Sequence, residues 1–421
     1  MNPKWKSCLL GDVLTLQRGF DITKKEQKQG PVPVISSSGI NSYHDTAKVK
    51  GPGVIIGRKG SLGTVFYVGE GYWPHDTTLW VKDFHGNSPK FTYYFLGTLN
   101  LANFDVGASN PTLNRNHIHL LPIRWPSLIA QHKIATILST YDDLIENNTR
   151  RIVILEEMAQ AIYQEWFVHF RYLGYEKNKI VESEVGKKPE SWSIEKLSKL
   201  VSTQYGYTES ASEIEIGPKF LRGMDINKTS YIQWDLVPYC TIDENDYIKY
   251  KLVVGDIIII RMADPGKVGI VEKEIDAIFA SYLIRLQITQ PSISSYYLLY
   301  FLNSEKYQNY ITGASTGTTR KSASAGVITD VNLTIPSKDV LESFEKKISL
   351  LRNMLNNLLN KNANLRHTRD MLLPKLISGE IDVEALDIKI PEVIEPEEQQ
   401  AISIVTQPES IDATQLALPL S

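Results

Sequence analysis

The sequence predicts an α+β protein, with two mixed α/β domains separated by two long helices that form an antiparallel coiled coil and an internal pseudo-twofold repeat. Three observations predict this fold. Two long stretches carry apolar residues at alternating steps of four and three, each stretch follows a β-rich segment, and the landmarks of the first β-rich segment recur in the second. A helix with one narrow apolar stripe needs a partner helix, so we expect the two stretches to pair.

The first long helix is predicted from a segment without helix breakers. Residues 127–170 contain no Gly or Pro, and one polar residue, Asn148, interrupts the apolar stripe. A helix of this length is a rod of roughly 65 Å. The residues expected to pack in the helix pair are Ile134, Leu138, Tyr141, Ile145, Asn148, Ile152 and Leu155.

The second long helix repeats this spacing 210 residues later. In an antiparallel pair, the offsets are expected to bring Asn148 close to Asn362, where a polar pair would set the register. The alternative is that either asparagine faces a partner protein. The expected packing residues of the second helix are Phe344, Ile348, Leu351, Leu355, Leu358, Asn362 and Leu365.

The two β-rich segments share landmarks in the same order, which indicates a duplication. GVIIGR at 53–58 parallels DIIIIR at 256–261, so Arg58 corresponds to Arg261. TYYFLGTLN at 92–100 parallels SYYLLYFLN at 295–303, and these segments are predicted to be short helices. The isoleucine- and valine-rich runs are predicted to be strands because Gly, Pro or Asp bounds them.

The predicted organisation has six segments. These are a first α/β domain at 1–126, a first long helix at 127–172, a linker at 173–189, a second α/β domain at 190–337, a second long helix at 338–379 and an acidic tail at 380–421. The tail has four prolines and no sustained apolar period, so we expect it to be disordered.

Composition narrows the class of protein. The net charge is −3, but residues 1–126 hold 14 Lys and Arg against 8 Asp and Glu, whereas residues 185–336 hold 16 against 17. A basic first domain is weak evidence for phosphate binding. Two distant cysteines, Cys8 and Cys240, argue against a disulfide scaffold and a structural zinc site. We see no signal peptide and no membrane-spanning run.

Catalytic motifs are missing from the sequence. The glycines at 57, 60 and 63 fit neither phosphate-loop pattern, and HExxH, GxSxG and the Asn/Asp-Pro-Pro-Tyr/Phe tetrapeptide of amino-methyltransferases are absent. His75 and Asp76 have the chemistry of ligands or bases, but surface hydrogen bonding is the preferred interpretation. No catalytic residue and no metal or cofactor site is therefore assigned.

Polar side chains on surface loops favour contact with DNA. Arg and Lys pair with guanine, Asn and Gln with adenine, and Lys, Arg and hydroxyl groups contact phosphates. In the first domain the candidates are Arg18, Lys24, Lys25, Ser37, Asn41, Tyr43, Arg58, Lys59, Asn114, Arg115 and Asn116. In the second domain they are Tyr205, Tyr207, Lys219, Arg222, Arg261, Lys267, Thr318, Thr319, Arg320 and Lys321.

Over residues 1 to about 384 the chain resembles the specificity subunits of type I restriction–modification systems. Trp5 followed by LGDVLTLQRG resembles the start of a target recognition domain. GVIIGRKGSLGTVFY and GDIIIIRMADPGKVGIV resemble its paired β-segments, and LEEMAQAIYQEWFVHF and LRHTRDMLLPKLISGEI resemble the ends of the two conserved helices. The second junction departs from the pattern because it lacks the counterpart of Gln131.

The resemblance implies a non-catalytic DNA-specificity subunit. Each recognition domain would read one half of a bipartite, asymmetric site in double-stranded DNA, and the helices would set the spacing between the halves. Two methyltransferase subunits would dock on the helices, on the outer face near Trp166 and Phe167, and two restriction/translocase subunits would join them. S-adenosylmethionine, ATP and Mg would bind those partners, which methylate adenine and cleave DNA. The expected location is the bacterial or archaeal cytoplasm.

Two other classes of function remain open from the sequence. A coiled-coil scaffold with protein-binding heads would have the same helices and repeats, but its binding would be insensitive to salt. A free-standing DNA enzyme is disfavoured by the missing motifs.

Overall fold

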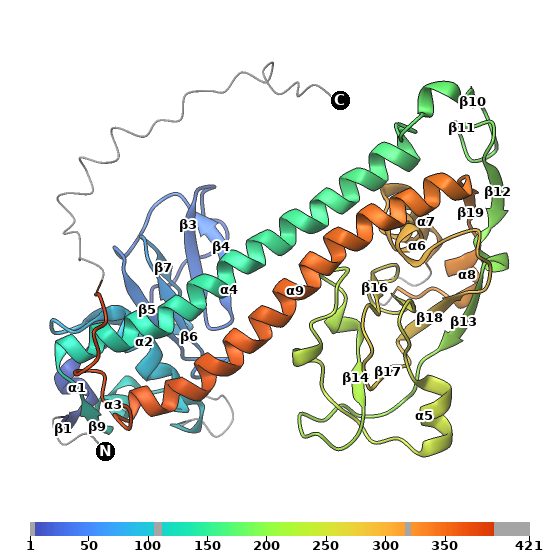
Figure 1. Cartoon of the computed structure of the whole chain (residues 1–421). Coiled ribbons are helices and arrows are strands. Elements are labelled where there is room, and N and C mark those ends of the chain that lie inside the picture. Colours follow the sequence, from blue (N-terminus) through green and yellow to red (C-terminus); the bar gives the residue numbers. More distant parts are fainter. Residues whose placement is uncertain (1–4, 105–111, 316–320, 391–421) are drawn as a thin grey trace. The chain divides into compact units, whose positions relative to one another are not determined.

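The structure, a computed structural model, describes residues 5–104, 112–315 and 321–390 (Figure 1). The chain forms two compact units. The first combines residues up to Asp143 with those from Arg366 onward, and the second is Leu144–Leu365. Each unit contains one α/β head and a part of both long helices, α4 (Leu128–Tyr163) and α9 (Lys338–Ile377). No helix in the described ranges is long and apolar enough to cross a membrane.

The first head is built on a four-stranded antiparallel sheet with strand order β2-β8-β5-β6. A second sheet has the order β4-β3-β7, and β1 pairs with β9. The elements of this head are β1 (Lys6–Leu9), α1 (Leu10–Val13), β2 (Thr15–Arg18), β3 (Val32–Ser36), β4 (Gly39–His44), β5 (Gly53–Gly57), β6 (Val65–Val68), β7 (Trp73–Pro74), β8 (Thr78–Asp83), α2 (Pro89–Gly97), η1 (Leu101–Phe104), α3 (Arg115–His119) and β9 (Pro122–Trp125).

Helix α2 links this sheet to the long helices. Ser88 caps its N-terminus by accepting a hydrogen bond from the Phe91 N–H, and Pro89 occupies the first turn, where its missing N–H is tolerated. Buried residues of α2, of the sheet, of α4 and of α9 form one core cluster. Burial of Ile134 and Leu138 within it explains why the apolar stripe of α4 begins there.

A polar group joins α2, α4 and α9 at the edge of this core. Tyr94 donates a hydrogen bond to the Asp142 carboxylate, and Arg369 Nη1 lies 2.5 Å from Asp142 Oδ1. Asp142 therefore contacts Arg369, whereas Ser127, just before α4, contacts Glu384, beyond the end of α9, so the partner position moves backward as α4 advances and the helices run antiparallel in this unit.

The start of the acidic tail is packed, and the prediction of disorder from residue 380 is wrong for this part. Val383 is buried in the first core, and Ile381 packs against it. Lys133 Nζ donates to the carbonyl oxygens of Glu384 and Leu386 at 2.9 and 2.7 Å. These contacts hold the start of the tail against the first core and α4. Residues 391–421 lie outside the described ranges.

The second head repeats this architecture. Its four-stranded sheet has the order β13-β18-β15-β16, the pair β14-β17 is parallel like β3-β7, and β12 pairs with β19 as β1 does with β9. Its elements are β10 (Ile180–Val181), β11 (Lys188–Pro189), β12 (Ser193–Lys196), η4 (Leu197–Lys199), β13 (Val201–Tyr205), β14 (Lys219–Leu221), η5 (Gly223–Asp225), η6 (Trp234–Leu236), α5 (Glu244–Tyr250), β15 (Ile257–Ile260), β16 (Val268–Ile270), β17 (Ala277–Phe279), β18 (Leu283–Ile288), α6 (Ser295–Leu302), α7 (Glu305–Ala314), α8 (Ala325–Thr329) and β19 (Asn332–Ile335).

Close backbone contacts recur at equivalent places in the two heads. The Gly19 N–H donates to the Thr78 carbonyl, and the Gly206 N–H donates to the Leu283 carbonyl. A Cβ atom at Gly19 would lie 2.1 Å from the His75 carbonyl oxygen, and one at Gly206 would lie 2.2 Å from that of Ala280. Both positions require glycine, which explains the shared glycine after β2 and β13.

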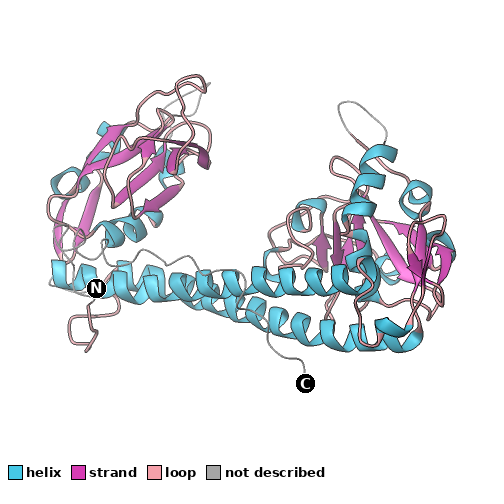
Figure 2. Ribbon diagram, turned by 90° about the horizontal axis from the view of Figure 1, so that it is seen from above, coloured by secondary structure: helices cyan, strands magenta, loops and turns pink. Residues whose placement is uncertain are grey.

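The helix pair of the second unit runs antiparallel, and α4 and α9 lie side by side in both views (Figures 1 and 2). Ile152, Leu155, Leu355 and Leu358 form one buried cluster between the helices. The expected packing residues are all buried or half-buried in their units. Phe344 at one end of this seam contacts Tyr163.

The two seam asparagines lie together. Asn148 Nδ2 donates to Asn362 Oδ1 at 2.9 Å, and Asn362 Nδ2 lies 3.3 Å from both the Ile145 carbonyl and Thr149 Oγ1. Both side chains are buried, so each amide compensates the desolvation of the other. A shift of register by one turn would break this contact and bury two unpaired amides.

A buried arginine attaches the second head to its helices. The Arg352 side chain is 1% exposed and lies 2.5 Å from both Glu156 Oε2 on α4 and Glu272 Oε2 after β16. Ser230 donates to the same Glu156 carboxylate. Burial alone lowers the pKa of Arg352, but the hydrogen bond and charge of Glu272 raise it, so the guanidinium stays charged.

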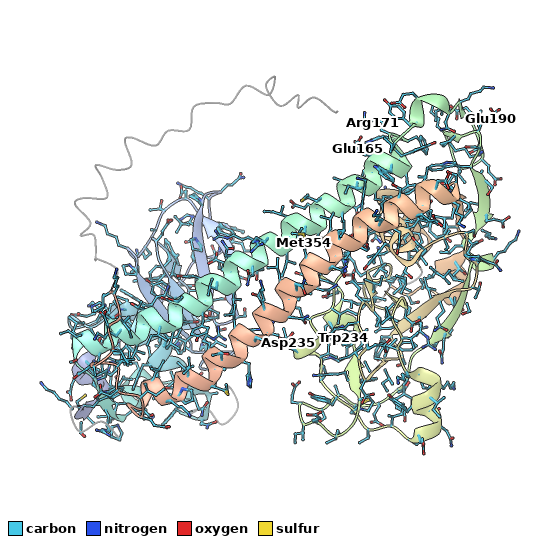
Figure 3. The ribbon with its side chains drawn as sticks, in the orientation of Figure 1. Glu165, Arg171, Glu190, Trp234, Asp235 and Met354 are labelled. Carbon is cyan, nitrogen blue, oxygen red and sulfur yellow. The ribbon has the colours of Figure 1, made fainter. Side chains whose placement is uncertain are left out.

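The regular part of α4 ends before the predicted boundary at 172. A π-helical turn, Gln164–Val168, follows, and Arg171 Nε returns to Glu165 Oε2 at 2.6 Å (Figure 3). Phe170 adopts a positive φ of 57°, which ends the helix. The predicted partner-binding role of Trp166 and Phe167 is wrong, because both side chains are buried in the core of the second head.

The predicted polar linker at 173–189 has structure of its own. Strands β10 and β11 pair as a short antiparallel hairpin, and Ser183 and Gly186 exchange backbone hydrogen bonds between them. Before the hairpin, Tyr172 stacks on Trp192 at a centroid distance of 5.4 Å. This contact joins the residues that precede the hairpin to those that follow it.

Replacing Asn148 by Leu should lower the free energy of unfolding by about 1–3 kcal/mol, because the buried Asn362 amide loses its partner. Thermal and urea unfolding of the full chain measure this effect. The double variant Asn148→Leu, Asn362→Leu should recover most of the stability, since no unpaired amide remains. Equal stability of the wild type and the single variant would contradict a role for the pair in the seam.

Candidate nucleic-acid interface

Polar side chains gather where the strands of the first four-stranded sheet end. Arg18 is the last residue of β2, Arg58 and Lys59 follow β5, and Asp76 precedes β8. Adjacent antiparallel strands bring these ends to the same edge. The backbone N–H groups of Arg58 and Lys59 both donate to the Thr77 carbonyl.

Two arginines meet at Asp76. Arg18 Nη2 lies 2.8 Å from Asp76 Oδ2, and Arg58 Nη2 donates to the Asp76 carbonyl oxygen at 3.2 Å. Partial burial raises the pKa of Asp76, but the Arg18 hydrogen bond and the charges of His75, Arg18 and Arg58 outweigh it, so the pKa is lowered. Asp76 therefore stays ionised. Ser37 joins the group because its N–H donates to Thr77 Oγ1 at 3.3 Å. We call Arg18, Ser37, Arg58, Lys59 and Asp76 the first loop cluster.

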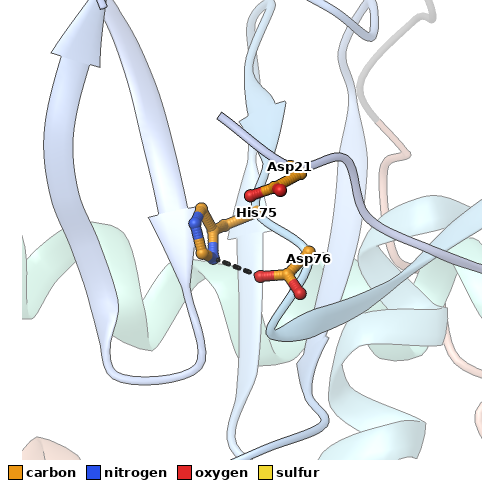
Figure 4. A group of neighbouring side chains, drawn as sticks. All are labelled: Asp21, His75 and Asp76. Carbon is orange, nitrogen blue, oxygen red and sulfur yellow. Dashed lines mark ion pairs between the residues drawn. The ribbon is translucent and has the colours of Figure 1, made fainter. Parts of the chain in front are cut away.

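Asp21, His75 and Asp76 are close enough together to hold a metal ion. Their ligand atoms lie within 4.8 Å of one another, and His75 Nδ1 is 3.1 Å from Asp76 Oδ1 (Figure 4). Arg18 already binds the other oxygen of Asp76. Positive charge at Arg18 and Arg58 opposes a cation here, so we interpret the Asp76 carboxylate as the partner of the arginines.

The segment before α3 lies beside this cluster. Lys59 forms a β-bridge with Thr112, and the Leu113 N–H donates to the Arg58 carbonyl. Asn114 Oδ1 caps α3 by accepting from the Asn116 N–H at 3.0 Å, so this amide has a structural role. Arg115 and Asn116 are exposed in the first turn.

The remaining candidates of the first head are exposed. Lys24 and Lys25 occupy the turn at 24–26, and Asn41 and Tyr43 lie on the edge strand β4.

The second head has a corresponding group at the end of its sheet. Tyr205 is the last residue of β13, and the Arg261 guanidinium carbon lies 5.0 Å from the centre of its ring. The Ser281 N–H donates to the Tyr207 carbonyl, and the Ala263 N–H donates to that of Lys321. We call Tyr205, Tyr207, Arg261, Ser281 and Lys321 the second loop cluster.

Two predicted cations of this head bind groups within it. Lys219 Nζ donates to the Val237 carbonyl at 2.7 Å, and Arg222 pairs with Asp225 at 3.0 Å. Lys267 is half-buried in the turn that leads into β16. Thr318, Thr319 and Arg320 lie outside the described residues.

A largely apolar pocket opens beside the second loop cluster. It has a volume of about 500 Å³, and Tyr207, Phe220, Met224, Met262 and Tyr282 contribute to its lining.

Sequence reasoning named Asp76 only as a residue with the chemistry of a ligand or base, and it missed both the contact of Asp76 with Arg18 and this pocket. Asp76 stands directly before a predicted strand, beside a strand that ends in Arg18, but only sheet pairing shows that the two residues meet. The lining of the pocket comes from separate segments between Tyr207, after β13, and Tyr282, before β18, so no local sequence pattern predicts it.

Comparisons with known proteins agree with this architecture. A family model described as "Type I restriction modification DNA specificity domain" matches residues 2–157. The MjaIX specificity subunit of Methanocaldococcus jannaschii is 27% identical over 316 residues, which cover 70% of each protein. The HindI specificity subunit of Haemophilus influenzae is 23% identical over 331 residues, or 64% of this chain and 71% of that protein.

A solved structure has a similar fold. The crystal structure of the S subunit of a type I restriction–modification system from M. genitalium matches with a TM-score of 0.56 at 16% identity. The match covers 89% of this chain and 96% of that one. It supports the α+β fold with two heads and long helices.

Replacing Arg115 by Ala should weaken binding of the preferred DNA sequence by about 1–3 kcal/mol and leave binding of unrelated duplexes unchanged, if Arg115 contacts a base. Titration of the full chain, in complex with its partner subunits, with labelled duplexes measures both affinities. Lys82→Ala is the matched control, because Lys82 is exposed toward the opposite end of β8. An equal loss for all duplexes would make Arg115 a phosphate contact instead.

Proposed function

We propose that this chain, which is similar to the specificity subunits of type I restriction–modification systems, is such a subunit and that each of its heads reads one half of a bipartite DNA site. The observation that carries the proposal is the duplicated loop cluster. Arg58 and Arg261 occupy equivalent positions at the ends of equivalent sheets, next to other polar or aromatic side chains. Two similar but chemically different reading surfaces suit an asymmetric site.

The helices set the spacing between the halves in this proposal. Their register is held in the second unit by the Asn148–Asn362 hydrogen bond and in the first by the Asp142–Arg369 pair. Specific polar contacts of this kind favour one alignment of two helices over its neighbours. A single alignment is what a fixed spacing requires.

Methyltransferase subunits dock on the free flank of the helix pair in this proposal. Glu156 and Arg352 each come directly after a residue of the seam, and they lie on the side of the seam that faces the second head. Met158 and Met354 each come directly before a residue of the seam, so they lie on the opposite side. Both methionines are exposed, as are Ile154 and Leu350 one turn earlier (Met354 is marked in Figure 3). Exposed apolar side chains grouped in this way are typical of protein interfaces.

The chain is non-catalytic in this proposal. Adenine methylation and ATP-dependent cleavage belong to two methyltransferase and two restriction/translocase subunits, which also bind S-adenosylmethionine, ATP and Mg. The chain's contribution is the choice of sequence.

A scaffold with protein-binding heads is the competing function, and salt separates the two. Binding to DNA through phosphate contacts falls steeply as salt rises, because counterions are released. A scaffold would bind a protein with little dependence on salt and leave no footprint on DNA.

Mapping methylated adenines tests the proposal directly. The complex of this chain with its methyltransferase should methylate a two-part motif with a constant gap. Exchanging residues 1–126 for the first head of another specificity subunit should change one half of that motif and leave the other half and the gap intact. Methylation without a two-part motif would refute the proposal, and a change in both halves would refute the independence of the heads.

Replacing Met158 and Met354 by Glu should weaken binding of the methyltransferase subunit at least about tenfold, because two charges would enter an apolar interface. The affinity is measured by co-purification and by titration of the purified subunit. Ile248→Glu on α5 is the matched control, since Ile248 is also exposed but lies in the second head. Unchanged binding at an unchanged melting temperature would exclude this flank.

A further inference from the structure

In the first loop cluster, one aspartate contacts two arginines, one through its carboxylate and the other through its backbone carbonyl. Asp76 binds the Arg18 side chain through Oδ2 and the Arg58 side chain through its backbone carbonyl. We propose that Asp76 is a positioning residue that holds Arg18 and Arg58 side by side, so that Arg18 reads a guanine in the half-site of the first head. This inference rests on the proposed function and names one chemical feature of its substrate.

Repulsion between the two arginines favours a carboxylate beside them. Burial and the charge of Arg18 lower the pKa of Arg58, while the charge of Asp76 raises it. The guanidinium groups therefore interact unfavourably with each other, and Asp76 offsets this. With a neutral residue at this position, Arg18 would move away into solvent.

The Arg18 side chain keeps the donors that guanine recognition needs. It is 57% exposed, against 21% for Asp76, so it extends further from the head. Of its five N–H groups, one donates to Asp76, and two of the others suffice for a bidentate contact with guanine O6 and N7. Because Asp76 already restricts this long side chain, less conformational entropy is lost when DNA binds.

The second head supports this assignment by contrast. The bridges Phe20–His75 and Tyr207–Ala280, and the donation from Arg58 to Thr77 and from Arg261 to Tyr282, align the two heads residue by residue. In this alignment Tyr205 replaces Arg18 and Ser281 replaces Asp76. Arg261 then lies over the Tyr205 ring. The first head therefore has both Arg18 and the Asp76 carboxylate, whereas the second head has neither an arginine nor a carboxylate at the equivalent positions.

Asp76 also has the chemistry to accept a hydrogen bond directly from cytosine N4. Its lower exposure and its engagement with Arg18 favour the positioning role, and the two roles differ in the base that is read. A positioning residue affects discrimination at the guanine that Arg18 contacts, whereas a direct contact affects a cytosine independently of Arg18.

The experiment uses the methyltransferase complex that contains the full chain. Once the motif is mapped, each guanine in the half read by the first head is replaced in turn by 7-deazaguanine, which lacks the N7 acceptor, and affinities are measured. In the wild type, one replacement should weaken binding about tenfold or more. Arg18→Ala should abolish this difference at that position only, and Asp76→Asn should reduce it severalfold at the same position.

Two controls separate positioning from loss of structure. Asp21→Asn removes the neighbouring carboxylate, which lies in the same group of side chains, and should leave discrimination unchanged. Discrimination in the half read by the second head should be unchanged in every variant, and unchanged recognition of the other bases in the first half-site shows that the mutated head is folded. The double variant Arg18→Ala, Asp76→Asn should behave like Arg18→Ala, because Asp76 acts through Arg18.

Several results would overturn the inference. The first is a half-site that contains no guanine. The second is an Asp76→Asn variant that loses affinity equally for all duplexes. The third is an Asp76→Asn variant that loses discrimination at a cytosine but keeps the discrimination at guanine that depends on Arg18. These failures leave a two-part motif intact, whereas failure of the proposed function would remove the motif itself.

Discussion

The apolar seam between α4 and α9 is the constraint on which the rest of the structure depends. Neither helix can bury its stripe alone, because each exposes a single narrow row of apolar side chains. In the first unit these side chains are buried in a cluster that includes Ile134 and Leu376, and in the second unit they are buried in a cluster that includes Ile152 and Leu358. Each head then adds its own core to the seam it adjoins.

Polar residues within and beside this seam have a different role from the apolar ones. Burying the Asn148 and Asn362 amides or the Arg352 guanidinium gains little stability compared with apolar packing. Each of these groups, however, finds its polar partner in one geometry. Asn148 donates a hydrogen bond to Asn362 Oδ1, and Arg352 forms ion pairs with Glu156 and Glu272. They therefore select one arrangement of helices and head. If the chain reads two DNA segments at a set separation, as we propose, this selection matters more than additional stability.

The two heads show how duplication permits divergence in chemistry. The glycines at 19 and 206 and the backbone hydrogen bonds around them keep the same close packing in both sheets. Side chains that project from this common frame differ: Arg18 and Asp76 in the first head correspond to Tyr205 and Ser281 in the second. A frame held by backbone contacts leaves its loop side chains free to change, which suits the proposed reading of a different sequence by each head.

The sequence by itself determined the repeat, the long helices and the seam, because periodic apolar spacing and turn residues are local properties of the chain. Seam residues such as Ile134 and Phe344 follow from their spacing alone. The tertiary structure decided what local patterns cannot express. It buried Trp166 and Phe167 in the second head, ordered Val383 against the first core, and engaged Arg222 with Asp225. It also brought Asp76 to Arg18 across 58 residues. That contact depends on which strands pair, and strand pairing is set by the whole sheet rather than by any segment of it.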